Sequence, residues 1–397
     1  MTGGKTVLGA TTAALAFSSI TQLFPSAIAP EIAASLNVTP ALIGVQVSLA
    51  YSGAMLSSLI GGGVSRRLGA CRTTQLAILF FGLGGLLAAI ADIRTFILAS
   101  LLIGLGYGLT NPAASHLLVR FTNPSRRGLV FGFKQTGVPL GGVIAGVLAP
   151  ALTVALGWQA AMASLAIPAT LAILWLQRFH QRWDDDADAT ARWLSSPLSD
   201  IRLVWRLKAL RWTALASFFF SASQLCLTVF TVTLLVEDLG VALVTAGLMM
   251  SAVQISGVGG RVLWGWIADR IGRGLPTLMF INALTALLAL IVASLQPGAS
   301  PILVAALLSA LGLVALGWNG VYLAEVTKLS PPSDVARCSG GALFITFAGV
   351  LFGPAAFTGL HLITQSYSQT FILVTLSSLT GIALLIAAMR ASSGQRS

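Results

Sequence analysis

Twelve long apolar runs follow one another along the chain, and the segments between them are short except for a polar stretch at residues 177–211. An α-helix needs about 20 apolar residues to cross the hydrocarbon core of a bilayer, and each run approaches that length. A backbone in lipid must satisfy its own hydrogen bonds, so runs of this kind predict helices. The expected spans are 8–29, 41–65, 74–91, 95–119, 129–154, 158–176, 212–236, 242–268, 275–295, 300–326, 338–360 and 367–389.

The composition excludes a water-soluble fold. Hydrophobic residues make up 56% of the 397 residues and charged residues only 9%, whereas soluble domains carry about 25% charged residues. We therefore expect an all-α membrane protein with twelve transmembrane helices in two six-helix halves. The halves would be residues 1–176 and 212–397, joined at 177–211 by a cytoplasmic linker with an interfacial helix. The first run is long and is followed by Pro30, which favours an uncleaved helix over a signal peptide.

The basic residues predict how the chain is oriented in the membrane. With the N-terminus placed inside, 20 of the 23 lysine and arginine residues fall on the inner side, and only Arg94 lies in an outer loop. This distribution follows the positive-inside rule. The net charge of +11 then reflects membrane insertion, so no nucleic-acid partner is expected. We expect a multi-pass protein of a bacterial-type inner membrane, surrounded by lipid, with both termini in the cytoplasm.

The polar stretch at 177–211 divides into two parts. Asp184, Asp185, Asp186 and Asp188 form an acidic run, which we expect to be a solvated linker. After Pro197 the apolar and basic residues alternate with helical spacing, which predicts a helix lying flat on the inner leaflet.

A short loop motif occurs once in each half, at 62–72 and at 265–274. Both copies have glycine at the start, arginine in the middle and glycine before the next apolar run. A second repeat extends from Asn111 through Pro124 to Arg127, and from Asn319 through Pro332 to Arg337. Repeats of this kind predict two related bundles. The residues of the loop motif are Gly62, Arg66, Arg67 and Gly69 in the first copy, and Gly265, Asp269, Arg270, Gly272 and Arg273 in the second.

Two six-helix halves, a basic middle loop and this motif resemble the major facilitator superfamily, and the resemblance covers essentially the whole chain. It implies that the motif loops are gating elements, which latch the two halves on the cytoplasmic side in the outward-open state. Asp269 would pair with a basic group, and Arg270 and Arg273 would answer a carboxylate such as Glu325. The first copy departs from the pattern, because Arg66 stands where the second copy has Asp269.

Within the superfamily, Arg261-Val-Leu-Trp-Gly265 is similar to the eighth-helix arginine motif of monocarboxylate and oxalate/formate transporters. The stretch from Arg126 to Gly137 also resembles their pattern. This resemblance implies that Arg261 binds a substrate carboxylate. Helices five and eight face each other in the superfamily, which implies that Lys134 and Arg261 reach one central cavity.

Lys134 and Arg261 are the two basic residues that fall inside predicted spans. A charge within a span is unfavourable by about 2.5–3.5 kcal/mol or more unless it faces a cavity or a partner. No acidic residue is evident in the core to neutralise them, so together they would suit an anion, and arginine can grip a carboxylate with two hydrogen bonds. Two structural alternatives stay open: Lys134 could reach the inner surface along its apolar stem, and Arg261 could serve only the loop near Asp269.

Neutral polar residues in the spans are further candidates for substrate binding, although hydrogen bonds between helices explain each of them equally well. Glu325 and His116 are candidates for proton coupling. For Glu325, an ion pair with Lys328 one turn away is the structural alternative, and His116 could equally be structural. The neutral candidates are Gln254, Tyr107, Asn111, Gln135, Asn319 and Tyr322.

These observations predict a secondary transporter that moves a small organic anion, a mono- or dicarboxylate, by alternating access. It would work as a proton symporter or an anion exchanger and function as a monomer. The alternative is an exporter of neutral lipophilic drugs or metabolites. We expect no enzyme, because no constellation of nucleophile, base and metal ligand is apparent. We expect no cofactor and no metal, and Cys71, Cys226 and Cys338 form no spaced set.

Overall fold

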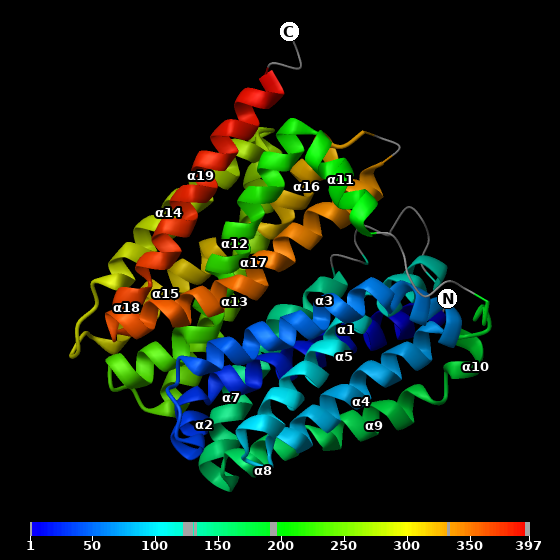
Figure 1. Ribbon diagram of the computed structural model, residues 1–397, viewed down its shortest axis with the longest axis horizontal. Helices are drawn as coiled ribbons and strands as arrows, with labels where there is room; N and C mark the ends of the chain where they lie inside the picture. The colour runs from blue at the N-terminus through cyan, green and yellow to red at the C-terminus, as the bar shows by residue number, and fades with distance from the viewer. Residues whose placement is uncertain (1, 122–129, 131–132, 191–196, 332–333, 394–397) are drawn as a thin grey trace. The chain divides into compact units, whose positions relative to one another are not determined.

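The structure is a computed structural model, and it describes residues 2–121, 130, 133–190, 197–331 and 334–393. Every regular element in these ranges is helical (Figure 1), which confirms the all-α prediction. Parts of the second sequence repeat, including Pro124, Arg126, Arg127 and Pro332, lie outside the described residues. Contacts divide the chain into two compact units, Met1–Ser195 and Ser196–Ser397, so the division falls inside the polar stretch.

The first unit is a bundle in which α3 packs along α5, α5 packs on α4, and α1 packs on α7. Small residues allow the close packing. A Cβ on Gly104 of α5 would lie 1.8 Å from the carbonyl oxygen of Ala50 on α3, so only glycine fits this contact. The helices are α1 (Thr2–Ala27), α2 (Ala29–Leu36), α3 (Leu42–Leu68), α4 (Ala70–Ala88), α5 (Ile93–Phe121), α7 (Gly137–Leu156), α8 (Trp158–Ala163), α9 (Ala166–Leu176) and α10 (His180–Trp183).

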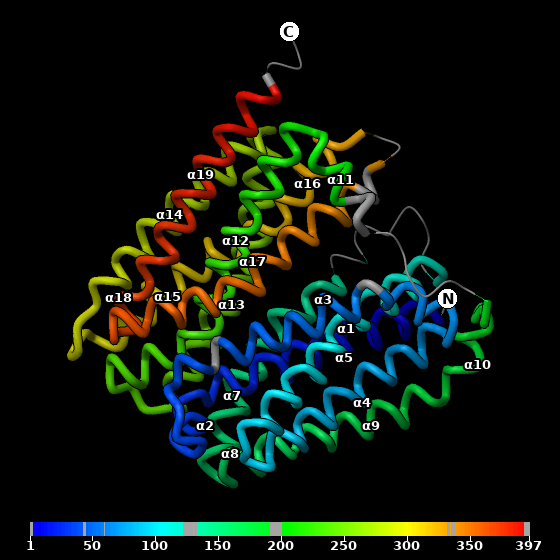
Figure 2. Tube along the Cα trace, viewed as in Figure 1, coloured from blue at the N-terminus to red at the C-terminus, as the bar shows by residue number. Residues whose placement is uncertain are grey.

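The second unit is built around α12, which packs against both α17 and α19 (Figure 2). Glycine again sets the distance between helices, since a Cβ on Gly349 would lie 1.9 Å from the carbonyl oxygen of Phe218. The elements are α11 (Pro197–Arg206), α12 (Lys208–Thr233), the π-helical turn η2 (Leu234–Asp238), α13 (Leu243–Ile271), α14 (Gly274–Ala293), α15 (Pro301–Ala315), α16 (Asn319–Leu329), α17 (Val335–Thr364), α18 (Tyr367–Thr370) and α19 (Ile372–Ser393).

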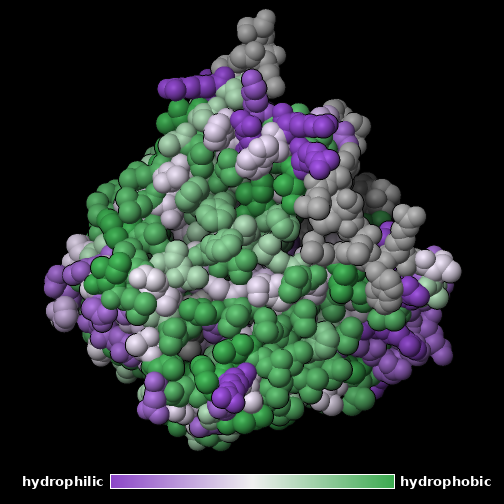
Figure 3. Space-filling model, viewed as in Figure 1, coloured by the Kyte–Doolittle hydropathy of each residue, from purple (hydrophilic) through white to green (hydrophobic). Residues whose placement is uncertain are grey.

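The described residues contain eleven helical spans long and apolar enough to cross a membrane, or twelve if a bent pair within α3 is counted as one span. This agrees with the twelve predicted spans. Large apolar side chains such as Ile302 and Ile363 are about four-fifths exposed, and hydrophobic residues cover much of the face seen in Figure 3. A surface of this kind is stable in lipid and not in water.

Candidate substrate-binding site

Lys134 is buried in the first unit with only 2% of its surface exposed. Its Nζ donates a hydrogen bond to Oδ1 of Asn111 on α5. Lys134 therefore does not extend to the surface, which was one of its predicted alternatives. Among the described residues, no carboxylate lies within ion-pair distance of Nζ. The structure thus brings together two predicted site residues as a buried ammonium with a neutral partner.

Tyr107 lies one turn before Asn111 on α5 and contacts the ring of Tyr51 on α3 edge to face, with centroids 5.6 Å apart. Tyr51 was not predicted, because nothing in the sequence shows which tyrosines of different helices meet. Gln135, another predicted residue, is exposed while its neighbour Lys134 is buried, so the two side chains leave the helix in different directions. The candidate site residues of the first unit are therefore Lys134, Asn111 and Tyr107, and the structure adds Tyr51 to them.

Arg261 lies on α13 beside a break in the neighbouring helix. The helical path is interrupted between α15 and α16, and Nε of Arg261 donates to the carbonyl oxygen of Leu316 in this break at 3.2 Å. The close approach depends on Gly260, where a Cβ would lie 2.0 Å from the carbonyl oxygen of Leu313. Trp264 donates its indole N–H to the same Leu313 oxygen at 3.0 Å. Broken helices leave backbone groups available at membrane depth, where transporters use them in binding sites.

Asn319, at the start of α16, belongs to the same group of contacts. Its Nδ2 lies 3.5 Å from the Leu316 oxygen and donates at 3.0 Å to Oε1 of Gln224 on α12. The indole N–H of Trp318 donates to that same Oε1 at 2.9 Å. Arg261, Asn319, Gln224 and Trp318 are thus linked by successive hydrogen bonds within the second unit.

Two other predicted residues of the second unit are deeply buried. Gln254, on α13, is 4% exposed. Tyr322 is 1% exposed, and its hydroxyl accepts from Ser217 at 3.0 Å and lies 3.4 Å from both the Thr346 hydroxyl and the Ala342 carbonyl oxygen. These contacts join α12, α16 and α17, which is the interhelical role left open for Tyr322.

The loop motif of the second unit lies at the surface. Asp269, Arg270 and Arg273 are exposed, and no described residue forms an ion pair with Asp269. Gly272 ends α13 in the left-handed conformation with φ of 68°, which glycine adopts without strain. The Arg270 guanidinium lies 5.3 Å from the centre of the Trp266 ring. Gly265 has open space at the position of a Cβ.

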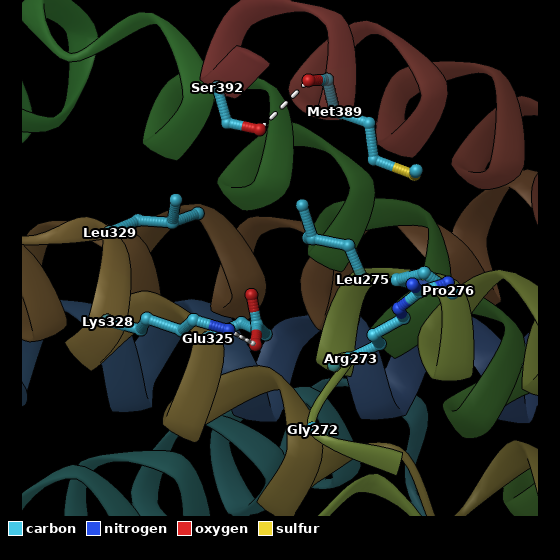
Figure 4. Close-up of a pocket in the computed structure, with 10 residues that line it drawn as sticks. Gly272, Arg273, Leu275, Pro276, Glu325, Lys328, Leu329, Met389 and Ser392 are labelled. Atoms are coloured by element: carbon cyan, nitrogen blue, oxygen red, sulfur yellow. Dashed lines mark hydrogen bonds and ion pairs between the residues drawn. The ribbon is translucent and has the colours of Figure 1, made fainter. Parts of the chain in front are cut away.

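Glu325 packs against Gly274 at the start of α14, and its Oε1 lies 3.4 Å from Nζ of Lys328. The expected one-turn ion pair is therefore present. Glu325, Lys328 and Arg273 line a cavity of about 670 Å³ at this end of the unit (Figure 4), but no ion pair between Arg273 and Glu325 is found. The role of Glu325 in proton coupling stays a prediction.

In the first unit the acidic run contacts the bundle, although Asp185, Asp186 and Asp188 are exposed, as expected of a solvated segment. The Asp184 carboxylate accepts hydrogen bonds from the backbone N–H groups of Cys71 at 2.7 Å and Arg72 at 3.1 Å, at the start of α4. Burial raises the pKa of Asp184, against the opposing effect of these two bonds. Gly69 adjoins the carboxylate with φ of 95°. An anion at a helix N-terminus is stabilised by the unpaired N–H groups there.

The rest of the run binds nearby elements. Arg120 at the end of α5 contacts Asp185 at 2.5 Å and Asp186 at 2.6 Å, and His116 lies 2.7 Å from Asp186. The backbone N–H of Asp188 donates to the carbonyl oxygen of Arg66 at 2.8 Å. Hydrogen bonds from Thr190 lower the pKa of the exposed Asp188.

The remaining residues of the first loop motif differ in exposure. Arg66 is exposed and Arg67 is half-buried, while Gly62 has open space where a Cβ would stand. The motif is therefore attached to the acidic run through the Arg66 carbonyl and Gly69.

Comparison with known proteins agrees with this fold. Residues 7–354 match the model of the Major Facilitator Superfamily. A probable 4-methylmuconolactone transporter of Cupriavidus pinatubonensis is 31% identical over 270 residues, which cover 66% of this chain and 61% of that protein. The hexuronate transporter of Bacillus subtilis is 23% identical, covering 88% of this chain and 86% of that protein. The chain thus spans less than two thirds of the first of these relatives.

Two solved structures show the same fold at low identity. A peptide transporter POT in complex with sulfate superposes with a TM-score of 0.77 at 16% identity, covering 97% of this chain and 94% of that one. An inward-facing bacterial homologue of the lysosomal transporter Spinster gives a TM-score of 0.69 at 15% identity, covering 98% and 95%. The family match, the helical spans and these superpositions agree, and the chain belongs to the Major Facilitator Superfamily of membrane transporters.

Proposed function

We propose that this transporter moves a small organic anion, a mono- or dicarboxylate, by alternating access. The observation that carries the proposal is the buried ammonium of Lys134, whose partner is the neutral amide of Asn111. A buried cation costs several kcal/mol unless a charge of opposite sign compensates it. Because no described carboxylate does so, the substrate is the natural source of the negative charge.

The second unit contributes a cation of its own. Arg261 is oriented by the Leu316 carbonyl at the helix break, and its planar guanidinium suits a carboxylate. The relatives named as transporters of 4-methylmuconolactone and hexuronate support an organic acid as the substrate class. We infer that Lys134 and Arg261 bind the anion and that the loops at 62–72 and 265–273 are gates on the inner side of a bacterial-type cell membrane, with the protein active as a monomer.

Thermal stabilisation of the purified protein by ligands tests the proposal, since a ligand that binds only the folded state must raise Tm. The ligands are monocarboxylates, dicarboxylates, neutral lipophilic solutes and cationic dyes. Stabilisation by a carboxylate should disappear in Arg261→Ala and in Lys134→Gln, and persist in Arg202→Ala, where the arginine is exposed on α11. Stabilisation by neutral solutes that is equal in all four proteins would instead favour the exporter of neutral compounds.

Transport into proteoliposomes then separates the two coupling modes. For proton symport, an inward proton gradient accelerates uptake of the stabilising carboxylate, and Glu325→Gln or His116→Gln removes the acceleration. For anion exchange, uptake requires a carboxylate inside the vesicle and is unaffected by the gradient. The buried position of Glu325 favours testing it before His116, which already contacts Asp186 at 2.7 Å.

A further inference from the structure

The amide of Gln224 has a fixed orientation because of its two hydrogen-bond partners. An indole N–H can only donate, so the Gln224 atom 2.9 Å from Trp318 Nε1 must be the oxygen. Packing holds the indole in place: its ring lies against Phe220 and Tyr322, with centroids 5.5 and 5.3 Å away. The usual ambiguity between amide oxygen and nitrogen is therefore removed.

The Asn319 amide is oriented in the same way. Its Nδ2 faces two oxygens, Oε1 of Gln224 and the carbonyl oxygen of Leu316. Oε1 of Gln224 then accepts two hydrogen bonds, which is the capacity of an amide oxygen. The remaining groups are the Nε2 donors of Gln224 and the Oδ1 acceptor of Asn319, and no described residue forms a hydrogen bond with either. Both side chains are half-buried, so a ligand can reach them.

We propose that Gln224 and Asn319 recognise a hydroxyl group of the transported anion, so that the substrate is a hydroxylated carboxylate. A hydroxyl both accepts and donates, and it can therefore accept from Nε2 of Gln224 while donating to Oδ1 of Asn319. A second carboxylate in this position would be repelled by the partial negative charge of Asn319 Oδ1. An apolar group would leave Nε2 of Gln224 and Oδ1 of Asn319 without a hydrogen-bond partner. The inference rests on the proposed function, because it assigns the carboxylate of the same molecule to Arg261.

The position of the pair relative to Arg261 supports one ligand for both. The Leu316 carbonyl oxygen accepts from Nε of Arg261 and from Nδ2 of Asn319, at 3.2 and 3.5 Å. One backbone oxygen of the helix break therefore lies between the cation and the amide pair. A molecule with a carboxylate and hydroxyl groups a few bonds apart would match these two positions.

Binding of a matched pair of probes tests the proposal. Glucuronate and cyclohexanecarboxylate share a six-membered ring and a carboxylate, but the second lacks hydroxyl groups. We expect the wild type to bind glucuronate at least about tenfold more tightly, since a site built for a hydroxyl strongly disfavours an analogue without it. In Gln224→Leu and Asn319→Leu the glucuronate Kd should rise about tenfold, while the Kd of cyclohexanecarboxylate stays unchanged. Retained binding of the second probe shows that the variants are folded.

The control is Gln369→Leu on α18, where the glutamine is exposed, and it should keep the preference. A preference for glucuronate that survives in Gln224→Leu overturns the proposal, and so does a wild type that binds neither probe. Equal binding of both probes that depends on Arg261 overturns the hydroxyl recognition and leaves the anion-transport proposal standing. A preference that depends on Gln224 but on neither Arg261 nor Lys134 supports hydroxyl recognition and contradicts the anion function.

Discussion

The carboxylate of Asp184 occupies the space that a side chain on Gly69 would need. A Cβ built on Gly69 would lie 2.2 Å from Cγ of Asp184, and the φ of Gly69 is 95°. Asp184 directly follows α10, more than a hundred residues after Gly69 in the chain, and its carboxylate caps the N-terminus of α4. The second glycine of the first loop motif is thus required by a neighbouring carboxylate as well as by its own backbone.

Gly69→Ala should therefore destabilise the protein. The left-handed φ costs a residue with a side chain about 1–3 kcal/mol, and displacement of Asp184 adds the loss of a helix cap, about 1 kcal/mol. Gly62→Ala in the same motif is the control, because a Cβ there meets nothing within 4 Å. Melting temperatures in detergent should fall for Gly69→Ala and stay equal or rise for Gly62→Ala. Equal melting temperatures for the two variants would contradict the assigned contact.

The titration of Asp184 should appear in the pH dependence of stability. Burial raises its pKa above the ordinary value of 3.8, so the folded state binds the proton more tightly than the unfolded chain. The group then contributes most stability below pH 3.8, and this contribution is lost as pH rises through the folded-state pKa. The Tm of the wild type minus that of Asp184→Asn should decrease over this range. A difference that increases with pH would show that the two backbone hydrogen bonds lower the pKa of Asp184 by more than burial raises it.

Arg120 should hold the acidic run to α5 through a small, salt-sensitive interaction. It contacts Asp185 and Asp186, but all three side chains are partly exposed, and pairs of this kind contribute about 1 kcal/mol or less. We expect Arg120→Ala to lower Tm slightly at low salt and less at high salt. Arg178→Ala, at an exposed arginine in the same region, is the control and should show no effect. An effect of Arg120→Ala that is independent of salt would argue for packing instead of charge.

Lys134 should lower stability while it supports binding. Replacing it with methionine removes a buried charge that has a neutral partner, so Lys134→Met should raise the Tm of the ligand-free protein. The expected gain in the free energy of unfolding is about 1 kcal/mol or more. The same variant should lose stabilisation by carboxylates. Lys208→Met is the control, because this lysine is exposed at the start of α12. A lower Tm for ligand-free Lys134→Met would show that Lys134 is structural.

Gly260 should be required for the position of Arg261. A Cβ on Gly260 would lie 2.0 Å from the carbonyl oxygen of Leu313, whereas one on Gly259 would meet its nearest atom at 3.9 Å. Gly260→Ala should push α13 from α15, cost about 1–3 kcal/mol and weaken carboxylate binding. Gly259→Ala should be neutral or stabilising by up to about 1 kcal/mol. Similar binding and Tm for these adjacent variants would contradict the close packing at the helix break.

Much of the fold could be predicted because each membrane helix is specified by the residues of its own segment. Each span satisfies its own backbone hydrogen bonds, so length and apolarity indicate a helix without knowledge of its neighbours. The break between α15 and α16 was not predicted, since residues 300–326 read as one apolar run. Gly317 lies in this break, where a Cβ would lie 2.6 Å from Trp264 of α13. Its need for glycine thus depends on a neighbouring helix.

The candidate site was predicted in part. Lys134, Arg261, Asn111 and Asn319 could be named because polar groups are costly within apolar runs, and this cost is visible in the sequence. Their partners could not be named. The meeting of Asn319 with Gln224 depends on the packing of α16 against α12, and Tyr322 belongs to a network with Ser217 that the sequence does not distinguish from a binding surface.

The sequence by itself determined the helical membrane fold and the cations that must be compensated, because these follow from the composition and spacing of single segments. Only the tertiary structure decided that Asp184 caps the N-terminus of α4 and that the amide oxygen of Gln224 accepts from Trp318. An acidic run has the same composition whether it is solvated or bound, and an amide can turn either way. The position of the carboxylate and the orientation of the amide are each determined by a hydrogen-bond partner that is distant in the sequence.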